Sequence, residues 1–108
     1  MKPQYYILDG REPVVCHDRM KWAEFMENID LRRVAIDEVA GREISTVFLG
    51  LDHSFGAEGL PVLFETIVFK PGTSADEEMY RYCTWEEAEA GHREVCAALR
   101  TKQATPRQ

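Results

Sequence analysis

Hydrophobic residues recur with helical spacing in two segments of the chain. In the first segment, Asp18 is a candidate N-cap, and the apolar residues after it lie at i, i+3, i+4 and i+7: Trp22, Phe25, Met26 and Ile29. Because this spacing places them on one stripe of a helix, it predicts an amphipathic helix that ends near residues 28–30.

The second helical segment opens with a capping box at residues 84–87 (TWEE). In this motif the Thr84 hydroxyl and the Glu87 carboxylate each accept a hydrogen bond from a backbone N–H group at the helix start. The residues that follow trace one face of the helix: Trp85, Ala88, His92, Val95, Cys96 and Leu99.

Five runs rich in β-branched and aromatic residues predict strands, at residues 5–8, 33–39, 43–51, 62–69 and 80–83. The turn dipeptide Asp9-Gly10 and then Pro13 end the first run, and Ala40-Gly41-Arg42 gives a hairpin signal between the second and the third. The predicted order is β-α-β-β-β-β-α. It indicates an α+β fold with a mainly antiparallel sheet and two helices packed on one face.

The length of 108 residues predicts a single domain, assigned to residues 1–100, followed by a flexible C-terminal tail at residues 101–108. The two central strands are apolar on both faces, which is typical of strands buried on both sides. Two helices can cover one face of such a sheet. We therefore expect the uncovered face to meet a second copy of the chain, a partner protein or a ligand.

Composition narrows the function classes. A net charge of −6 and a pI near 5.0 disfavour direct nucleic-acid binding, which needs a basic surface. The three cysteines are odd in number and lack CxxC spacing, and no signal peptide precedes them, so a reduced, cytoplasmic compartment is predicted. No apolar run approaches the roughly 20 residues that span a bilayer, so no membrane association is expected.

Candidate chemistry begins at Asp52-His53, where a β-prone run breaks off into a glycine-containing loop. Loops at strand ends often carry function, but an Asp at this place also caps turns, and both interpretations stay open. Together with His92, the pair would supply the ligands of a small metal-dependent hydrolase. His92 on an apolar helix face is otherwise a core histidine that donates to a backbone carbonyl.

Three further residues are candidates for binding. Glu65 lies in an apolar strand, where a carboxylate needs a partner; a salt bridge to Arg33 or Arg81 and a role in a site are the two interpretations. Tyr80 and Tyr82 would present an aromatic contact surface, because tyrosine is common at interfaces. Neither a phosphate-binding glycine loop nor a Ser-His-Asp order is present, and no cofactor is predicted.

Four segments resemble a group of small proteins encoded by bacteriophages and prophages: residues 6–10 (YILDG), 45–53 (STVFLGLDH), 63–66 (LFET) and 82–92 (YCTWEEAEAGH). The resemblance spans most of the chain. It implies a phage-associated protein in the bacterial cytoplasm, without an activity that can be transferred.

The preferred hypothesis is a non-catalytic phage accessory protein that binds a host protein or a small nucleotide-like ligand, with a role in counter-defence, and forms a homodimer. The first alternative is the metal-dependent hydrolase that uses Asp52, His53 and His92. The second alternative is a structural component of the virion.

Overall fold

The computed structural model describes residues 4–54 and 59–104. Within them the chain forms six strands and three helices: β1 (Tyr5–Asp9), β2 (Glu12–Cys16), α1 (Arg19–Glu27), α2 (Ile29–Arg32), β3 (Arg33–Val39), β4 (Arg42–Phe48), β5 (Phe64–Phe69), β6 (Asp76–Tyr82) and α3 (Trp85–Ala104). The α+β class with antiparallel sheets is confirmed. Among these residues no helix is long and apolar enough to cross a membrane.

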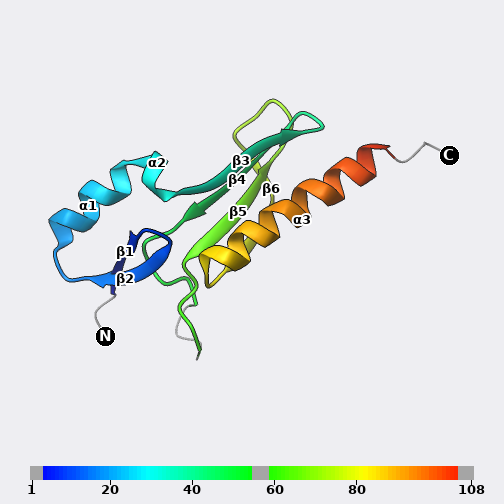
Figure 1. The fold of residues 1–108 in the computed structure, drawn as a ribbon. Coiled ribbons are helices and arrows are strands. Elements are labelled where there is room, and N and C mark those ends of the chain that lie inside the picture. The colour runs from blue at the N-terminus through cyan, green and yellow to red at the C-terminus, as the bar shows by residue number, and fades with distance from the viewer. Residues whose placement is uncertain (1–3, 55–58, 105–108) are drawn as a thin grey trace.

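The strands form two antiparallel sheets (Figure 1). β1 pairs with β2 as a hairpin, and the larger sheet is a meander with the order β3-β4-β5-β6. The turn between β3 and β4 places both Ala40 and Gly41 at positive φ, 56° and 77°. Two central residues of this kind define the tight turns that match the twist of paired strands, which explains why the sequence Ala40-Gly41-Arg42 signals this hairpin correctly.

Both outer strands of the larger sheet contain a register shift. In β3, Arg33 pairs with Val47 and Ala35 pairs with Thr46, so Val34 is an extra residue. In β6, Glu78 pairs with Val68 and Asp76 pairs with Phe69, so Glu77 is an extra residue. Such bulges bend a strand and increase its local twist.

The helix starts agree with the local sequence. The Asp18 carboxylate accepts hydrogen bonds from the Met20 and Lys21 N–H groups at the start of α1. At α3, Glu87 N–H donates to Thr84 Oγ1 and Thr84 N–H donates to Glu87 Oε1, both at 3.1 Å, as the capping box predicts. α3 continues through residues 101–104, which were assigned to the tail, and residues 105–108 lie outside the described residues.

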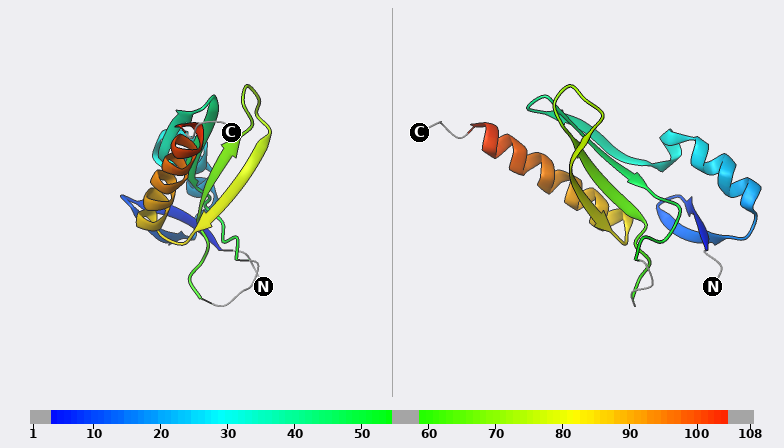
Figure 2. Two further views of the ribbon diagram at one scale, coloured as in Figure 1. Left: turned by 90° about the vertical axis from the view of Figure 1, so that its right-hand side faces the viewer. Right: turned by 180° about the vertical axis from the view of Figure 1, so that it is seen from behind.

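The two long helices occupy different places, although both were expected on one face of the sheet. α3 packs on the larger sheet and contacts all four of its strands, whereas α1 packs mainly against β1 and β2 (Figure 1). The indole N–H of Trp22 fixes α1 by donating to the Gly50 carbonyl at 3.2 Å. In the described part of the chain, the sheet face opposite α3 therefore has no helix over it (Figure 2).

Two elements were not predicted. β2 contains Pro13, which in the sequence indicates the end of a strand. Proline is nevertheless tolerated in a strand that has a neighbour on one side only, and Pro13 lies opposite Leu8 in the hairpin. α2 is a single turn, capped by the Asn28 side chain, which accepts from Asp30 N–H at 3.1 Å.

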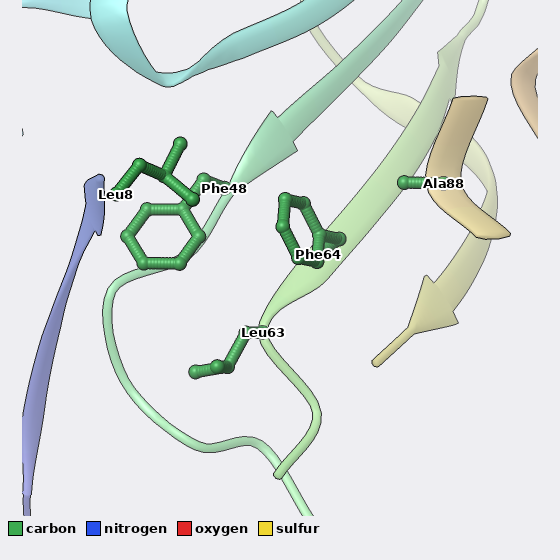
Figure 3. Close-up of a cluster of buried hydrophobic side chains, with 5 residues drawn as sticks. All are labelled: Leu8, Phe48, Leu63, Phe64 and Ala88. Atoms are coloured by element: carbon green, nitrogen blue, oxygen red, sulfur yellow. The ribbon is translucent and has the colours of Figure 1, made fainter. Parts of the chain in front are cut away.

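The core lies between α3 and the larger sheet. One cluster contains Leu8, Phe48, Leu63, Phe64 and Ala88 and reaches the hairpin at one end (Figure 3). A second cluster, nearer the C-terminal half of α3, contains Val39, Ile44, Val68 and Cys96. Polar groups lie between the two clusters, as described below.

Candidate functional site

The open face of the larger sheet carries three rows of side chains, because cross-strand partners point to the same side of a sheet. The apolar row consists of Ile36, Ser45, Ile67 and Met79, and the basic row consists of Arg33, Val47, Glu65 and Arg81. The acidic row lies beyond the apolar row and contains Glu38, Glu43, Phe69 and Asp76. Adjacent rows are two residues, or roughly 7 Å, apart along the central strands β4 and β5.

Exposure shows that this face is accessible. Ile36 and Met79, at the two ends of the apolar row, are 42% and 44% exposed. Ile67 and Val47 are half-buried although no helix of the described chain lies over them. A hollow of about 460 Å³ opens beside the acidic row and is also lined by Lys70, which supplies a positive charge at this end.

Glu65 is the buried carboxylate of the basic row, with 8% of its surface exposed. Arg81 Nε donates to Glu65 Oε2 at 3.1 Å, so one of the two predicted partners is found. Arg33 lies in the same row, and its buried Nε has no hydrogen-bond partner among the described residues. Arg81 therefore balances the charge of Glu65, and Arg33 gives the basic row a net positive charge.

Asp52 and His53 lie in the segment that follows β4, and the Asp52 carboxylate caps backbone N–H groups there. Asp52 Oδ1 accepts from the N–H groups of Ser54 and Val62, both at 2.8 Å, and Oδ2 accepts from the Ser54 hydroxyl. Partial burial raises the pKa of Asp52, but the hydrogen bonds from Val62 and Ser54 outweigh it and hold the pKa below its ordinary value. Since these are the contacts of a capping residue, the turn interpretation accounts for Asp52.

His92 lies at the centre of a polar network between α3 and the sheet, with 3% of its surface exposed. Its Nε2 is 2.7 Å from Asp37 Oδ2, and its Nδ1 is 2.7 Å from Thr46 Oγ1. Thr46 Oγ1 in turn lies 2.5 Å from Thr66 Oγ1. The expected backbone carbonyl partner of His92 is thus replaced by a carboxylate and a threonine hydroxyl.

Cys96 joins this network one helical turn after His92. Its Sγ lies 3.9 Å from Asp37 Oδ2, and burial, together with the Asp37 carboxylate, raises the pKa of the thiol. Asp37, His92 and Cys96 form the one group of three or more possible metal ligands found among residues 4–54 and 59–104. Asp52 and His53 do not belong to it, so the residues of the hydrolase hypothesis are not brought together there.

The order Asp37–His92–Thr46 has the form of a nucleophile activated by a base that a carboxylate orients. However, Thr46 has no exposed surface, and it contacts a second buried hydroxyl instead of a cleft. A substrate cannot reach its oxygen. We therefore exclude acyl or phosphoryl transfer to Thr46 and interpret the hydroxyls as partners that orient His92.

Tyr80 and Tyr82 flank α3 at the β6 edge. The Tyr80 hydroxyl donates to Glu78 Oε2 at 2.9 Å, and this hydrogen bond raises the pKa of Tyr80. Tyr82 packs against Gly91, where a Cβ atom would collide with the phenol ring. A shallow hollow of about 250 Å³ lies between the two tyrosines and α3. Tyr80 is exposed and available for contacts, whereas Tyr82 mainly packs against α3.

A small pocket of about 240 Å³ lies between the β1–β2 hairpin and the start of α3. Its lining includes Tyr6, Arg11 and Trp85, and the guanidinium of Arg11 lies 5.5 Å from the centre of the Trp85 ring. The buried Trp85 Nε1 has no hydrogen-bond partner in the described parts of the chain. Of the surfaces that the structure describes, this one best fits the expectation of a small nucleotide-like ligand, because the Trp85 ring and the Arg11 guanidinium could stack on a base.

Sequence reasoning missed Asp37, Thr46, Thr66 and Cys96 as parts of one network. The available signals were the i, i+4 spacing of His92 and Cys96 and the polar residues at inward positions of three strands. Comparisons with protein-family models, with curated proteins and with solved structures found no match.

Proposed function

We propose that this protein acts by binding and forms a homodimer through the open face of its larger sheet. The observation that carries the proposal is the order of the three rows, acidic, apolar and basic, along this face. The apolar row is exposed at both ends, and Arg33 carries the positive charge of the basic row that the Glu65–Arg81 pair leaves uncompensated. A second copy of the face would supply opposite charges to the acidic and basic rows and an apolar surface to the apolar row.

A two-fold dimer uses the same patch on both copies. When the two-fold axis runs across the strands through the apolar row, the apolar rows of the two copies pack against each other. The basic row of each copy then faces the acidic row of the other. Arg33 of one copy then faces Glu38 of the other, and Arg81 faces Asp76. An axis parallel to the strands would instead bring like charges together, so the charge pattern selects the first arrangement.

The size of the face sets the expected affinity. Four strands of about seven residues measure roughly 19 Å by 23 Å. This area is smaller than the roughly 800 Å² per partner of a standard interface. We therefore expect a dimer that dissociates on dilution, and the acidic and basic rows make the association weaker at high salt.

Analytical ultracentrifugation over a concentration series tests this assembly. Met79→Lys places a charge in the apolar row and should give a monomer at all concentrations. Met20→Lys is the matched control, because Met20 is 70% exposed on α1, away from the sheet face, and this variant should dimerise like the unmodified chain. An unmodified chain that stays monomeric at every concentration would contradict the proposal.

Charge exchange tests the orientation. Arg33→Glu and Glu38→Arg should each weaken the dimer, and the double variant should restore it, since the exchanged charges again face each other across the axis. If the double variant is weaker than either single variant, the orientation is wrong even if a dimer exists. Circular dichroism of each variant checks that the fold is retained.

The resemblance to phage and prophage proteins suggests the setting of this binding, an infected or lysogenic bacterial cell. In that setting we propose a host protein as the target, with counter-defence as the biological role. The pocket beside Arg11 and Trp85 supports the narrower possibility of a small aromatic ligand. Ligand-observed NMR with adenosine and adenosine monophosphate tests that possibility, and Arg11→Ala should abolish any signal.

A further inference from the structure

Three side chains of different chemistry converge where α3 crosses β3. His92 and Cys96 are four residues apart, so they project from the same face of α3, and Asp37 reaches them from the facing strand. The possible ligand atoms lie within 4.8 Å of one another. Asp37 Oδ2 lies 2.7 Å from His92 Nε2 and 3.9 Å from Cys96 Sγ.

These distances are close to those of a tetrahedral zinc site. Zinc binds nitrogen and oxygen at about 2.0–2.2 Å and sulfur at about 2.3 Å, so neighbouring ligand atoms are roughly 3.5 Å apart. Small shifts, in which His92 and Asp37 separate and Cys96 approaches, would bring the three atoms to that spacing. We propose that Asp37, His92 and Cys96 bind a single divalent transition-metal ion, with zinc as the best-matched ion.

The surroundings of His92 favour this role. A ligating histidine usually has its second ring nitrogen fixed by a hydrogen bond. Here Nδ1 contacts Thr46 Oγ1, and Thr66 Oγ1 lies next to Thr46 Oγ1. Hydroxyl hydrogens rotate, so Thr46 can donate to Nδ1 when Nε2–H is bound to Asp37 and can accept from Nδ1–H when Nε2 binds a metal.

The mixed ligand set identifies the class of ion. A thiolate, an imidazole and a carboxylate together suit zinc or cobalt(II), whereas magnesium and calcium prefer sites made of oxygen atoms. The Asp37 side chain is 47% exposed, so an ion can enter from solvent on this side, and a water molecule would complete the tetrahedron. His92 and Cys96 close the other side, since both are almost fully buried.

Titration of the full chain with cobalt(II) under reducing conditions tests the site. We expect one equivalent to produce a thiolate-to-cobalt charge-transfer band and intense tetrahedral d–d bands, and zinc to displace both. The charge-transfer band should disappear in Cys96→Ala, and cobalt affinity should fall at least about tenfold in Asp37→Asn. In Asp37→Asn the side-chain oxygen can still accept a hydrogen bond from His92, so we expect this variant to fold.

Cys83→Ala and His53→Gln are the matched controls, because both residues lie outside the group of three ligands. Each should bind cobalt like the unmodified chain. The proposal is overturned if the unmodified chain gives no charge-transfer band, if the band persists in Cys96→Ala, or if it disappears in Cys83→Ala. Met79→Lys should bind cobalt normally, because the metal ligands lie on the helix-covered side of the sheet; the metal site is thus tested independently of the dimer.

Discussion

The two faces of the larger sheet differ in how their polar side chains are arranged, although the same four strands form both. On the face below α3, the polar groups of Thr46, Thr66 and His92 are all satisfied within the chain. On the open face, charges are sorted into separate rows, and the buried Nε of Arg33 finds no partner among the described residues. The helix-covered face thus provides hydrogen-bond partners for the Thr46, Thr66 and His92 side chains within one chain. The open face leaves Ile36 and Met79 exposed at the two ends of its apolar row, and the proposed dimer rests on that exposure.

The sharpest test of this contrast uses two phenylalanines of the same strand. Phe64 has no exposed surface, whereas Phe69 is half-buried on the open face. We expect Phe64→Ala to lower the free energy of unfolding by about 3–5 kcal/mol, because it leaves a cavity in the core. Phe69→Ala should cost less than half as much in urea unfolding of the dilute chain, and equal losses would show that both faces are buried.

Gly91 tests how closely α3 approaches the sheet. Gly91→Ala improves helix propensity by about 1 kcal/mol, but the new Cβ atom would enter the Tyr82 ring. We expect the collision to dominate, with a net loss of about 1–2 kcal/mol in thermal or urea unfolding. In a Tyr82→Ala background the same change should become stabilising. If it destabilises both backgrounds equally, the Tyr82 contact is not the cause.

Thr46 and Ser45 are neighbours in β4 that point to opposite faces. Thr46→Val keeps the shape of the side chain but leaves His92 Nδ1 without its partner, which should cost about 1–3 kcal/mol. The same change should weaken cobalt binding about tenfold, since it removes the group that orients His92. Ser45→Val on the open face should change the stability of the monomer by less than about 0.5 kcal/mol, and a larger effect would contradict the assignment of faces.

The smallest expected effect concerns Asp52, which belongs to neither face. Its pKa is lower in the folded chain than the ordinary value of 3.8, so its stabilising contribution is complete above that value and is lost as the pH falls through the folded pKa. Unfolding midpoints of the unmodified chain and of Asp52→Asn should therefore converge as the pH is lowered below 4 or so. A constant difference between them would show that the charge of Asp52 is not involved.

Sequence prediction is accurate where the interacting residues are close in the sequence and fails where they are far apart. The starts of α1 and α3 depend on Asp18, Thr84 and Glu87, which act on the next few residues, and both starts are confirmed. The pairing of Glu65 with Arg81 was one of two predicted salt bridges. The contact of Asp37 with His92 spans 55 positions and depends on how α3 lies across β3, which periodicity does not specify.

The homodimer, the phage setting and the host target stay predictions, supported by the surface pattern and by the resemblance. The expectation that two helices share one face failed for a physical reason. The apolar stripe of α1 packs on the β1–β2 hairpin, and the sequence does not predict β2 because Pro13 indicates a strand end.

The bulges at Val34 and Glu77 limit how the protein can aggregate. A regular outer strand is a template on which further chains can add, and repeated addition produces fibrils. Here the outermost strand on either side is irregular, so a neighbouring chain cannot form an unbroken hydrogen-bond ladder with it. Growth in the plane of the sheet is thereby discouraged at both margins, and the proposed face-to-face dimer would be closed, because each copy uses the same face.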